Sequence, residues 1–384
     1  MGAEKSGGVW NSMKVLYIGH FREAGGWSNA AIDFALALDS VGVDVVCKDI
    51  KLTDKSSEVP NRIKELEQKT LSNIDYCIQN VLPHHLIATD KFKKNIAYFF
   101  SESTPITSSW ISNLNLMDEV WVPNSTNCDA LQESKIETDV KIVPVPCDIS
   151  KFDKNYDALN MPEVNDQFKF YTICDLNSRK NIESIIKCFH SEFCNGEQVA
   201  LVLKINRYGL SSQQVGEEFQ RISSAIKERL RIGQVQDFAK EVIIPTYLSN
   251  DQMNQLHKTC DCYISLSHGE AWSIPAFDAM AYGNTPICGN EGGPRAFIDS
   301  GDKDTGYLID GVYDVCFHMD PAFDFLFTGR EEWFHASESQ AKKAMRYYYE
   351  NRGKITNEQG LKQANNFSYE KIGNQMKEKL EANI

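Results

Sequence analysis

Short apolar runs alternate with amphipathic stretches along most of the chain. Residues 14–21 are mainly apolar, a polar turn with two glycines follows, residues 30–42 carry a broad apolar face at helical spacing, and residues 43–50 are apolar again. Ser28 or Asn29 can cap the helix. A strand, a turn, a helix and a second strand predict a βαβ unit, so we expect a parallel sheet with helices packed against it.

The alternation forms two consecutive series, which are separated by a polar, aperiodic linker at residues 150–167. The first series adds strands at 75–83, 95–100, 118–125 and 139–146 and a helix at 126–136. The second has strands at 168–174, 199–206, 241–248, 261–267 and 284–290, and helices at 182–193, 216–231, 250–260 and from 292. A charged helical tail begins near residue 336 and ends in a helix at 367–384. The pattern predicts an α/β protein with a flexible leader at 1–12 and two Rossmann-like domains, 13–155 and 156–366, facing a central cleft.

Composition and charge exclude several classes of function. The 384 residues are 42% hydrophobic and 11% aromatic, which is enough for two large cores. The net charge of −13 argues against nucleic acid and anionic membranes as partners. No apolar run approaches the roughly eighteen residues of a transmembrane helix, and the first residues lack the apolar core of a signal peptide. Eleven cysteines without a C-x-x-C spacing predict reduced thiols in a cytoplasmic protein and no zinc site.

Polar and glycine-rich turns follow several predicted strands, which is where open parallel sheets bind ligands. Gly25 and Gly26 allow the backbone to approach an anion at the next helix N-terminus, although an ordinary turn explains them equally well. Arg179 and Lys180 lie between a strand and a helix, where two cations can clamp a diphosphate; a solvated helix start is the alternative. The pattern G-x-G-x-x-G is missing, which argues against a dinucleotide-dependent dehydrogenase.

Two carboxylates flank a predicted helix start in the stretch SLSHGEAWSIPAFDAMAYG, residues 265–283. Glu270 follows a strand, and Asp278 would lie in the first turn of the next helix, where the helix dipole favours an acid. That dipole explains Asp278 without a ligand, but it leaves Glu270 unexplained. Between the two acids, three backbone amides can bind phosphate oxygens at the helix N-terminus; they belong to Ala271, Trp272 and Ser273.

The same stretch resembles the motif E-G-F-G-L-P-x-L-E-A-M-A-x-G of the family 4 retaining glycosyltransferases (glycosyl transferases group 1), which have the GT-B fold. Further segments are similar to motifs of that family in the same order along nearly the whole chain: AGGWSNAAIDFALALDSVGVDVV, DEVWVPNSTNCDAL, KIVPVPCDISKF, SRKNIESII and TPICGNEGGPRAFI. The resemblance implies an N-terminal acceptor domain, a C-terminal nucleotide-sugar domain, and a final helix at 367–384 that returns to the N-terminal domain.

The resemblance also implies catalytic roles. Glu270 would hold the hydroxyls of the donor sugar and help to place its anomeric carbon, and Lys180 with Arg179 nearby would neutralise the leaving diphosphate. The donor would be a UDP- or GDP-sugar, its sugar would be transferred with retained configuration, and enzymes of this kind generally need no metal. The N-terminal domain of the family often supplies a histidine near the reacting carbon. Here the comparable strand end offers Glu102, which we favour over two histidines after an earlier strand, His84 and His85.

Other matched positions would bind the nucleotide. Asp278 would accept hydrogen bonds from the ribose hydroxyls, the loop amides of residues 271–273 would bind the diphosphate, and backbone groups around Tyr247 and Leu248 would meet the base. Two glycines of the first domain would face the phosphates or the acceptor across the cleft; they are Gly25 and Gly26.

This sequence departs from the family pattern in several places. Asp278 replaces a Glu, AWS replaces G-F-G after Glu270, Asp175 stands where an Arg is frequent, and Arg295 stands where an acid is usual. The departures keep open a non-catalytic nucleotide-sugar-binding protein, and a GT-B epimerase or phosphorylase is a further alternative. The acceptor would be a glycan, a small molecule, a lipid or a protein.

Overall fold

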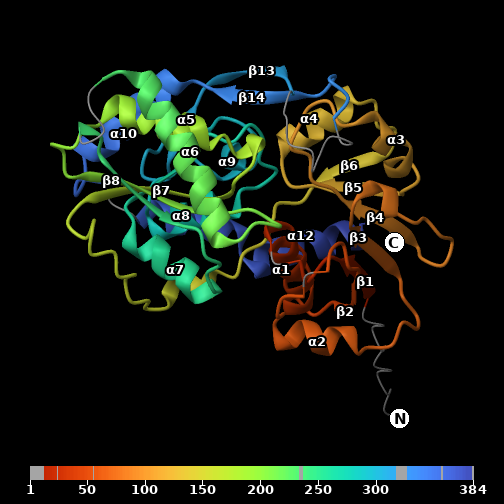
Figure 1. The fold of residues 1–384 in the computed structure, drawn as a ribbon. Coiled ribbons are helices and arrows are strands. Elements are labelled where there is room, and N and C mark those ends of the chain that lie inside the picture. Colours follow the sequence, from red (N-terminus) through yellow and green to blue (C-terminus); the bar gives the residue numbers. More distant parts are fainter. Residues whose placement is uncertain are drawn as a thin grey trace, which may run out of the picture.

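The computed structural model describes residues 13–23, 25–54, 56–232, 237–316, 327–355 and 358–382. Two six-stranded parallel sheets lie side by side, and helices cover their faces (Figure 1). The predicted α/β fold with two Rossmann-like halves is therefore confirmed. The leader predicted at residues 1–12 lies outside the described residues, and the exact domain boundaries stay predictions.

The first sheet has the strand order β2-β1-β3-β4-β5-β6, and every neighbouring pair is parallel. The order reverses between β1 and β3, so the carboxyl ends of these two strands form the topological switch point of the sheet. The elements of this half are β1 (Lys14–Gly19), α1 (Gly26–Ser40), β2 (Asp44–Asp49), α2 (Asn61–Glu67), β3 (Tyr76–Asn80), β4 (Lys94–Tyr98), α3 (Ser108–Leu114), β5 (Glu119–Val122), α4 (Ser125–Glu133) and β6 (Asp139–Ile142).

The second sheet has the order β12-β11-β10-β7-β8-β9, and its neighbours are also parallel. Here the reversal falls between β7 and β10, which makes their carboxyl ends the second switch point. The elements are β7 (Phe168–Asp175), α5 (Ile182–Glu192), β8 (Val199–Asn206), α6 (Ser212–Leu230), β9 (Lys240–Ile244), α7 (Asn250–Thr259), β10 (Cys262–Ser265), α8 (Ile274–Tyr282), β11 (Ile287–Gly289), α9 (Gly292–Phe297), β12 (Tyr307–Ile309), β13 (Gly311–Val315), β14 (Glu332–Ala336), α10 (Glu338–Glu350), α11 (Glu358–Ala364) and α12 (Tyr369–Glu381).

The central strands are buried on both faces. All five residues of β3 and the first seven residues of β8 are buried. Helices on both sides of a parallel sheet require this, and it explains why the strands appear in the sequence as continuous apolar runs. The carboxyl edges of the two sheets are consequently the places where polar side chains gather.

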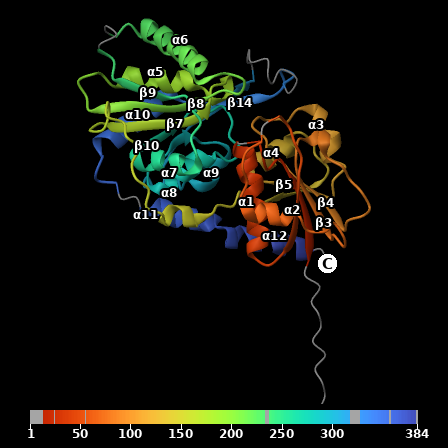
Figure 2. The same ribbon diagram turned by 60° about the horizontal axis from the view of Figure 1, so that its bottom comes forward.

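The last helix, α12, packs against α1 of the first half, although the two are separated by most of the chain (Figure 2). A Cβ atom on Gly373 would lie 2.3 Å from the carbonyl oxygen of Ala37, so only glycine permits this close approach. The Tyr369 hydroxyl donates a hydrogen bond to Asp33 Oδ1 at 2.6 Å. The chain thus crosses from the first half to the second and returns.

A two-stranded antiparallel hairpin, β13–β14, also joins the halves and lies at the top of Figure 1. The amide of Thr104 donates to the carbonyl of Glu332 at 3.1 Å, and the amide of Glu332 donates back to Thr104 at 2.7 Å. On its other side, Phe334 donates to the carbonyl of His268 at 2.9 Å. The hairpin therefore holds the loop after β10 next to the loop after β4.

Two boundary predictions were wrong. Helix α1 begins at Gly26 with Gly25 as its N-cap residue, so Ser28 and Asn29 lie inside the helix. The Ser28 hydroxyl instead donates to the carbonyl of His20 at 2.6 Å and accepts from the amide of Glu23, which fixes the preceding turn. Strand β9 ends at Ile244, so the last residues of the strand predicted at 241–248 form a loop.

Candidate functional site

The loops after β7 and β10 meet at the switch point of the second sheet. The ammonium of Lys180 lies 2.5 Å from Glu270 Oε1, and Arg179 Nη1 lies 3.7 Å from the same oxygen. Asn181 adopts a left-handed conformation at φ 48° and donates through its side chain to the carbonyl of Leu266 at 3.0 Å, which ties the two loops together. Because β7 and β10 are parallel neighbours, their carboxyl ends bring these cations next to Glu270, a contact that the sequence analysis did not predict.

Glu270 is an ionised carboxylate in a nearly closed environment, since its side chain is only 12% exposed. Burial alone would raise the pKa of Glu270, but the charges of Lys180 and Arg179 outweigh that effect and hold the pKa below its ordinary value. A fixed negative charge beside two cations can orient hydroxyl groups, and the cations can bind an anion that displaces their present partners.

Glu102 joins this cluster from the first half. Its Oε2 lies 3.0 Å from Arg179 Nε, and 42% of its side chain remains exposed. Arg179 also donates to the carbonyl of Gly269. A Cβ atom on Gly269 would lie 2.0 Å from the carbonyl oxygen of Glu102, so the two loops touch backbone to backbone. The cluster of Glu102, Arg179, Lys180 and Glu270, hereafter the charge cluster, therefore lies between the two halves.

A fifth charged residue of this site, Glu291, was not singled out from the sequence. It is the N-cap residue of α9, it is 9% exposed, and its Oε2 accepts from the amide of Glu270 at 3.4 Å. Burial, with the nearby charges of Glu270 and Glu102, raises the pKa of Glu291 to about 8. An acid between the end of β11 and a pair of glycines was the available signal in the sequence.

The loop of residues 270–273 is held by backbone contacts. A Cβ atom on Gly292, which has φ +56°, would lie 2.0 Å from the carbonyl oxygen of Glu270, and one on Gly293 would lie 2.0 Å from that of Trp272. From the first half, Asn124 Nδ2 donates to the carbonyl of Ala271 at 2.6 Å. Glycine-rich α9 and Asn124 thus fix this loop at the entry to α8.

The amides of this loop remain available. Within the described part of the chain, no hydrogen bond from the backbone amides of Ala271, Trp272 or Ser273 is observed. Ser273, the N-cap residue of α8, has φ 67° and ψ 69°, a left-handed conformation that costs a residue other than glycine about 1–2 kcal/mol. The indole of Trp272 packs into the core against Phe277 and Phe297, so this side chain does not face a ligand.

Asp278 does not lie in the first turn of the helix as predicted. Helix α8 begins at Ile274, so Asp278 opens its second turn. Its Oδ1 pairs with the ammonium of Lys151 at 2.7 Å. Lys151 lies in the segment that follows the last strand of the first half. Burial opposes ionisation of Lys151, but attraction to Asp278 prevails and raises its pKa. The structure therefore pairs Asp278 with Lys151, apart from the charge cluster.

The remaining predicted residues lie on the carboxyl edges of the two sheets. Tyr247 is 62% exposed in the loop after β9, with the Lys204 ammonium 5.9 Å from its ring centre, while Leu248 packs against the core. Gly25, the N-cap residue of α1, and Gly26, its first residue, are both exposed. Asp175, at the end of β7, accepts from Asn206. Two histidines are exposed after β3 and make no contact with the charge cluster among the described interactions; they are His84 and His85.

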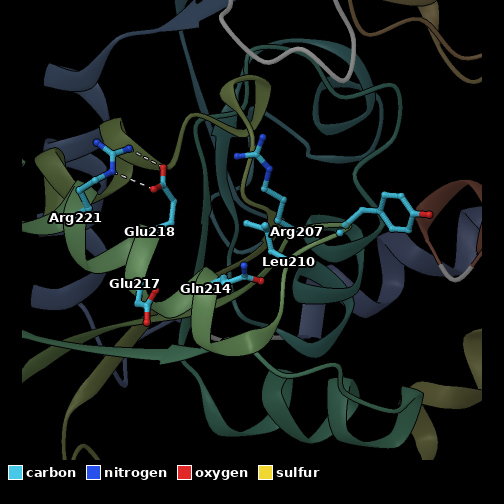
Figure 3. A pocket seen from close by; sticks show the side chains of 8 residues that line it. Arg207, Leu210, Gln214, Glu217, Glu218 and Arg221 are labelled. Atoms are coloured by element: carbon cyan, nitrogen blue, oxygen red, sulfur yellow. Dashed lines mark hydrogen bonds and ion pairs between the residues drawn. The ribbon is translucent and has the colours of Figure 1, made fainter.

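An open pocket lies one strand further, beyond the carboxyl end of β8. Its wall includes Arg207, Tyr208 and Gln214 at the start of α6. Figure 3 shows Glu218 and Arg221 paired on one side of it, at 2.6 Å. None of the residues predicted for the site lines this pocket. Among the described residues, no group of three or more His, Cys, Asp or Glu side chains could hold a metal ion, and no helix is long and apolar enough to span a membrane.

Comparison with known proteins agrees with this geometry. Residues 160–315, which include the switch point of the second sheet, match the family described as glycosyl transferases group 1. No curated protein sequence matches the chain.

Solved structures match over nearly the whole chain. Sucrose-phosphate synthase from Thermosynechococcus elongatus has a TM-score of 0.66 at 13% identity, with 96% of this chain and 98% of that one covered. Anabaena HepE, solved in complex with UDP-glucose, has a TM-score of 0.64 at 14% identity, covering 96% of this chain and 100% of that one. A trehalose-6-phosphate protein from E. coli, bound with UDP-2-fluoro glucose, has a TM-score of 0.65 at 9% identity, covering 96% and 99%.

Proposed function

We propose that this chain, which carries a glycosyl transferases group 1 domain at residues 160–315 and has the GT-B fold, is a retaining glycosyltransferase. It would move a sugar from a nucleoside diphosphate sugar to an acceptor. The carrying observation is the pairing of Lys180 with Glu270 at the switch point of the second sheet, beside three backbone amides that have no hydrogen-bond partner among the described residues. Cations and fixed amides are what a departing diphosphate requires.

Each member of the charge cluster has a distinct role in this proposal. Lys180 and Arg179 exchange their carboxylate partners for the diphosphate oxygens, whose negative charge grows as the glycosidic bond breaks. The amides of residues 271–273 bind the same oxygens. Glu270, released from Lys180, accepts hydrogen bonds from the sugar hydroxyls and holds the anomeric carbon towards the first half. Charge stabilisation by these residues needs no metal.

Glu102 is the proposed group of the first half at the reacting carbon. It contacts Arg179 directly, whereas His84 and His85 lie after β3 and make no such contact among the interactions of the described residues. A carboxylate there can stabilise the positive charge that develops on the sugar ring as the leaving group departs. This supports the preference for Glu102 that the sequence suggested.

The nucleoside would extend along the carboxyl edge of the second sheet. Asp278 would leave Lys151 to accept hydrogen bonds from the ribose hydroxyls, and backbone groups near Tyr247 and Leu248 would meet the base. A UDP-sugar is the favoured donor, because the similar structures of HepE and the trehalose-6-phosphate protein hold UDP-sugars, and a GDP-sugar is the alternative. Eleven free cysteines, most of them buried, suit a reducing compartment such as the cytoplasm.

A thermal-shift screen with UDP, GDP, ADP and their sugars tests the donor assignment. We expect UDP or GDP to raise the Tm, because a ligand that binds only the folded state stabilises it. If no nucleoside diphosphate or nucleotide sugar shifts the Tm, the proposed donor site is wrong. A shift without any sugar transfer would instead favour a non-catalytic nucleotide-sugar-binding protein.

Glu270→Gln tests the catalytic assignment, because it preserves the size of the side chain and removes its charge. We expect kcat to fall by roughly 10²-fold or more, while the Tm shift with UDP is retained. Glu228→Gln, which changes an exposed carboxylate on α6, is the matched control and should have wild-type activity. Wild-type turnover by Glu270→Gln would end the assignment.

Two further measurements test the finer statements. Asp278→Ala should weaken UDP binding in calorimetry, and an unchanged affinity would leave Asp278 with the Lys151 ion pair as its only role. NMR of the first-formed product reports the anomeric configuration, and an inverted product would refute retention. Activity in the presence of a chelator is expected to match activity without one.

A further inference from the structure

The switch point of the first sheet carries two buried polar atoms that the proposed reaction does not use. His20 follows β1, Asn80 ends β3, and both side chains are fully buried. Within the described part of the chain, neither His20 Nε2 nor Asn80 Nδ2 has a hydrogen-bond partner. Because most buried polar side-chain atoms in folded proteins are hydrogen-bonded, two exceptions at one switch point require an explanation.

The partners that these side chains do have define the chemistry of the free atoms. His20 Nδ1 lies 2.6 Å from the carbonyl oxygen of Ile50, which can only accept, so Nδ1 carries the proton. In the tautomer that carries its proton on Nδ1, Nε2 is an acceptor. Asn80 Oδ1 accepts from the indole N–H of Trp27, which leaves Nδ2 as a donor. The switch point therefore offers one free acceptor and one free donor.

Both side chains flank the same indole. The ring of Trp27 meets that of His20 edge to face, with centres 5.3 Å apart, and it is bonded to Asn80. Trp27 is half-buried and lies in the first turn of α1, directly after the exposed Gly25 and Gly26. A Cβ atom on either glycine would meet no atom within 4 Å, so there is open space next to this turn.

The position fits a substrate that reacts at the charge cluster. Strands β1, β3 and β4 are parallel neighbours, so their carboxyl ends lie on one edge of the sheet. The loop after β4 carries Glu102 to Arg179. Two strand spacings correspond to about 10 Å, a distance that an acceptor with the length of about two sugar units covers.

We propose that His20 and Asn80 bind one hydroxyl group of the acceptor, in a subsite walled by Trp27, and that the acceptor is a carbohydrate or a similar polyol. A hydroxyl both donates and accepts, so a single group can bond to His20 Nε2 and to Asn80 Nδ2. A fully deprotonated anion such as sulfate has no proton to offer to the Nε2 lone pair, so it does not satisfy the pair. Movement of the Trp27 ring opens the path from the turn. This inference rests on the proposed function. It adds to that function the chemical class of the acceptor and the residues that recognise it.

NMR of the wild-type protein labelled with [15N]histidine tests the inference directly. The His20 signals are assigned by their loss in His20→Gln, and their pattern should report a proton on Nδ1. The probes are a panel of methyl glycosides and glycerol, with sulfate as the separate anion arm. We expect a methyl glycoside to shift the Nε2 signal of His20 and sulfate to leave it unchanged. No shift with any polyol, or a shift with sulfate, would overturn the proposal.

Asn80→Asp provides the second test, because it keeps the oxygen that accepts from Trp27 and replaces only the free donor. We expect the KM for the glycoside acceptor to rise roughly tenfold, with an unchanged UDP thermal shift and unchanged donor hydrolysis in the absence of acceptor. Gln79→Glu is the matched control, since the neighbouring buried amide already bonds to the backbone of Ile87. An unchanged KM in Asn80→Asp refutes the subsite, whereas failure of the wild-type protein to bind any nucleoside diphosphate or nucleotide sugar refutes the proposed function instead.

Discussion

Replacing Gly269 by alanine should separate the two halves of the site. The Cβ atom would lie 2.0 Å from the carbonyl oxygen of Glu102, whereas real Cβ contacts essentially never fall below 3.0 Å, so the contact must lengthen by about 1 Å. Because the opposing atom belongs to the backbone, no side-chain rotation relieves the clash. The loop after β4, which brings Glu102 to Arg179, has to move away from the loop after β10.

A misplacement of about 1 Å at a reacting centre costs on the order of 10²-fold in rate. We therefore expect Gly269→Ala to lower kcat by roughly that factor, while the Tm changes by about 2 °C or less because both sheets keep their cores. The assay is steady-state turnover of the nucleotide sugar identified by the thermal-shift screen, together with the Tm shift caused by UDP.

Gly216→Ala is the matched control for this prediction. Gly216 lies in helix α6, where alanine is favoured over glycine by about 0.5–1 kcal/mol. The added Cβ atom would meet only the side chain of Ile243, at 3.7 Å. Wild-type kcat in Gly269→Ala would show that the two loops do not touch in the active protein. A large loss of Tm without loss of kcat would show that the contact supports folding rather than the site.

Other predictions concern strain, charge and pH. Ser273→Gly removes a left-handed non-glycine residue and should raise the free energy of unfolding by up to about 1 kcal/mol, which chemical denaturation measures; a loss of stability would contradict the strained conformation. Lys151→Met should lower the free energy of unfolding by roughly 3 kcal/mol, because it leaves Asp278 without its cation. The same change should tighten UDP binding in calorimetry, because Asp278 is then free to bind the ribose; weaker binding would contradict that role. Glu291 has a folded-state pKa of about 8, above the ordinary value of 4.5, so its contribution to stability is complete below about pH 4.5 and is lost as the pH rises towards 8. Glu291→Gln should flatten the fall of Tm over this range, and an identical pH profile would refute the raised pKa.

The charge cluster could be predicted in part from the sequence because its members follow apolar runs directly. Lys180 and Glu270 each come after a predicted strand, and the carboxyl ends of parallel strands share one edge. The sequence pattern does not predict that β7 and β10 are neighbours at a reversal of strand order. It also does not predict that the carboxylate of Glu291 accepts a hydrogen bond from the amide of Glu270. These facts depend on the order of strands in space, which local periodicity does not encode.

Contacts between the halves were beyond prediction for a similar reason. The approach of Gly269 to Glu102 and the bond from Asn124 to Ala271 depend on how two separately folded sheets dock. Asp278 was misplaced by one helical turn because the left-handed Ser273 delays the start of α8. The hairpin β13–β14 was missed because all five residues of β13 are exposed, so the strand has no alternating apolar face.

The return of α12 to α1 determines the order in which the protein can be completed during synthesis. The six strands of the first sheet leave the ribosome roughly 230 residues before α12, which at about 5–20 residues per second is a delay on the order of tens of seconds. Until then, the surface of α1 that later receives Gly373 has no cover. The first half is therefore synthesised first, but its structure is completed last. The nascent chain exposes an apolar face of α1 during the whole time that the second half is being translated.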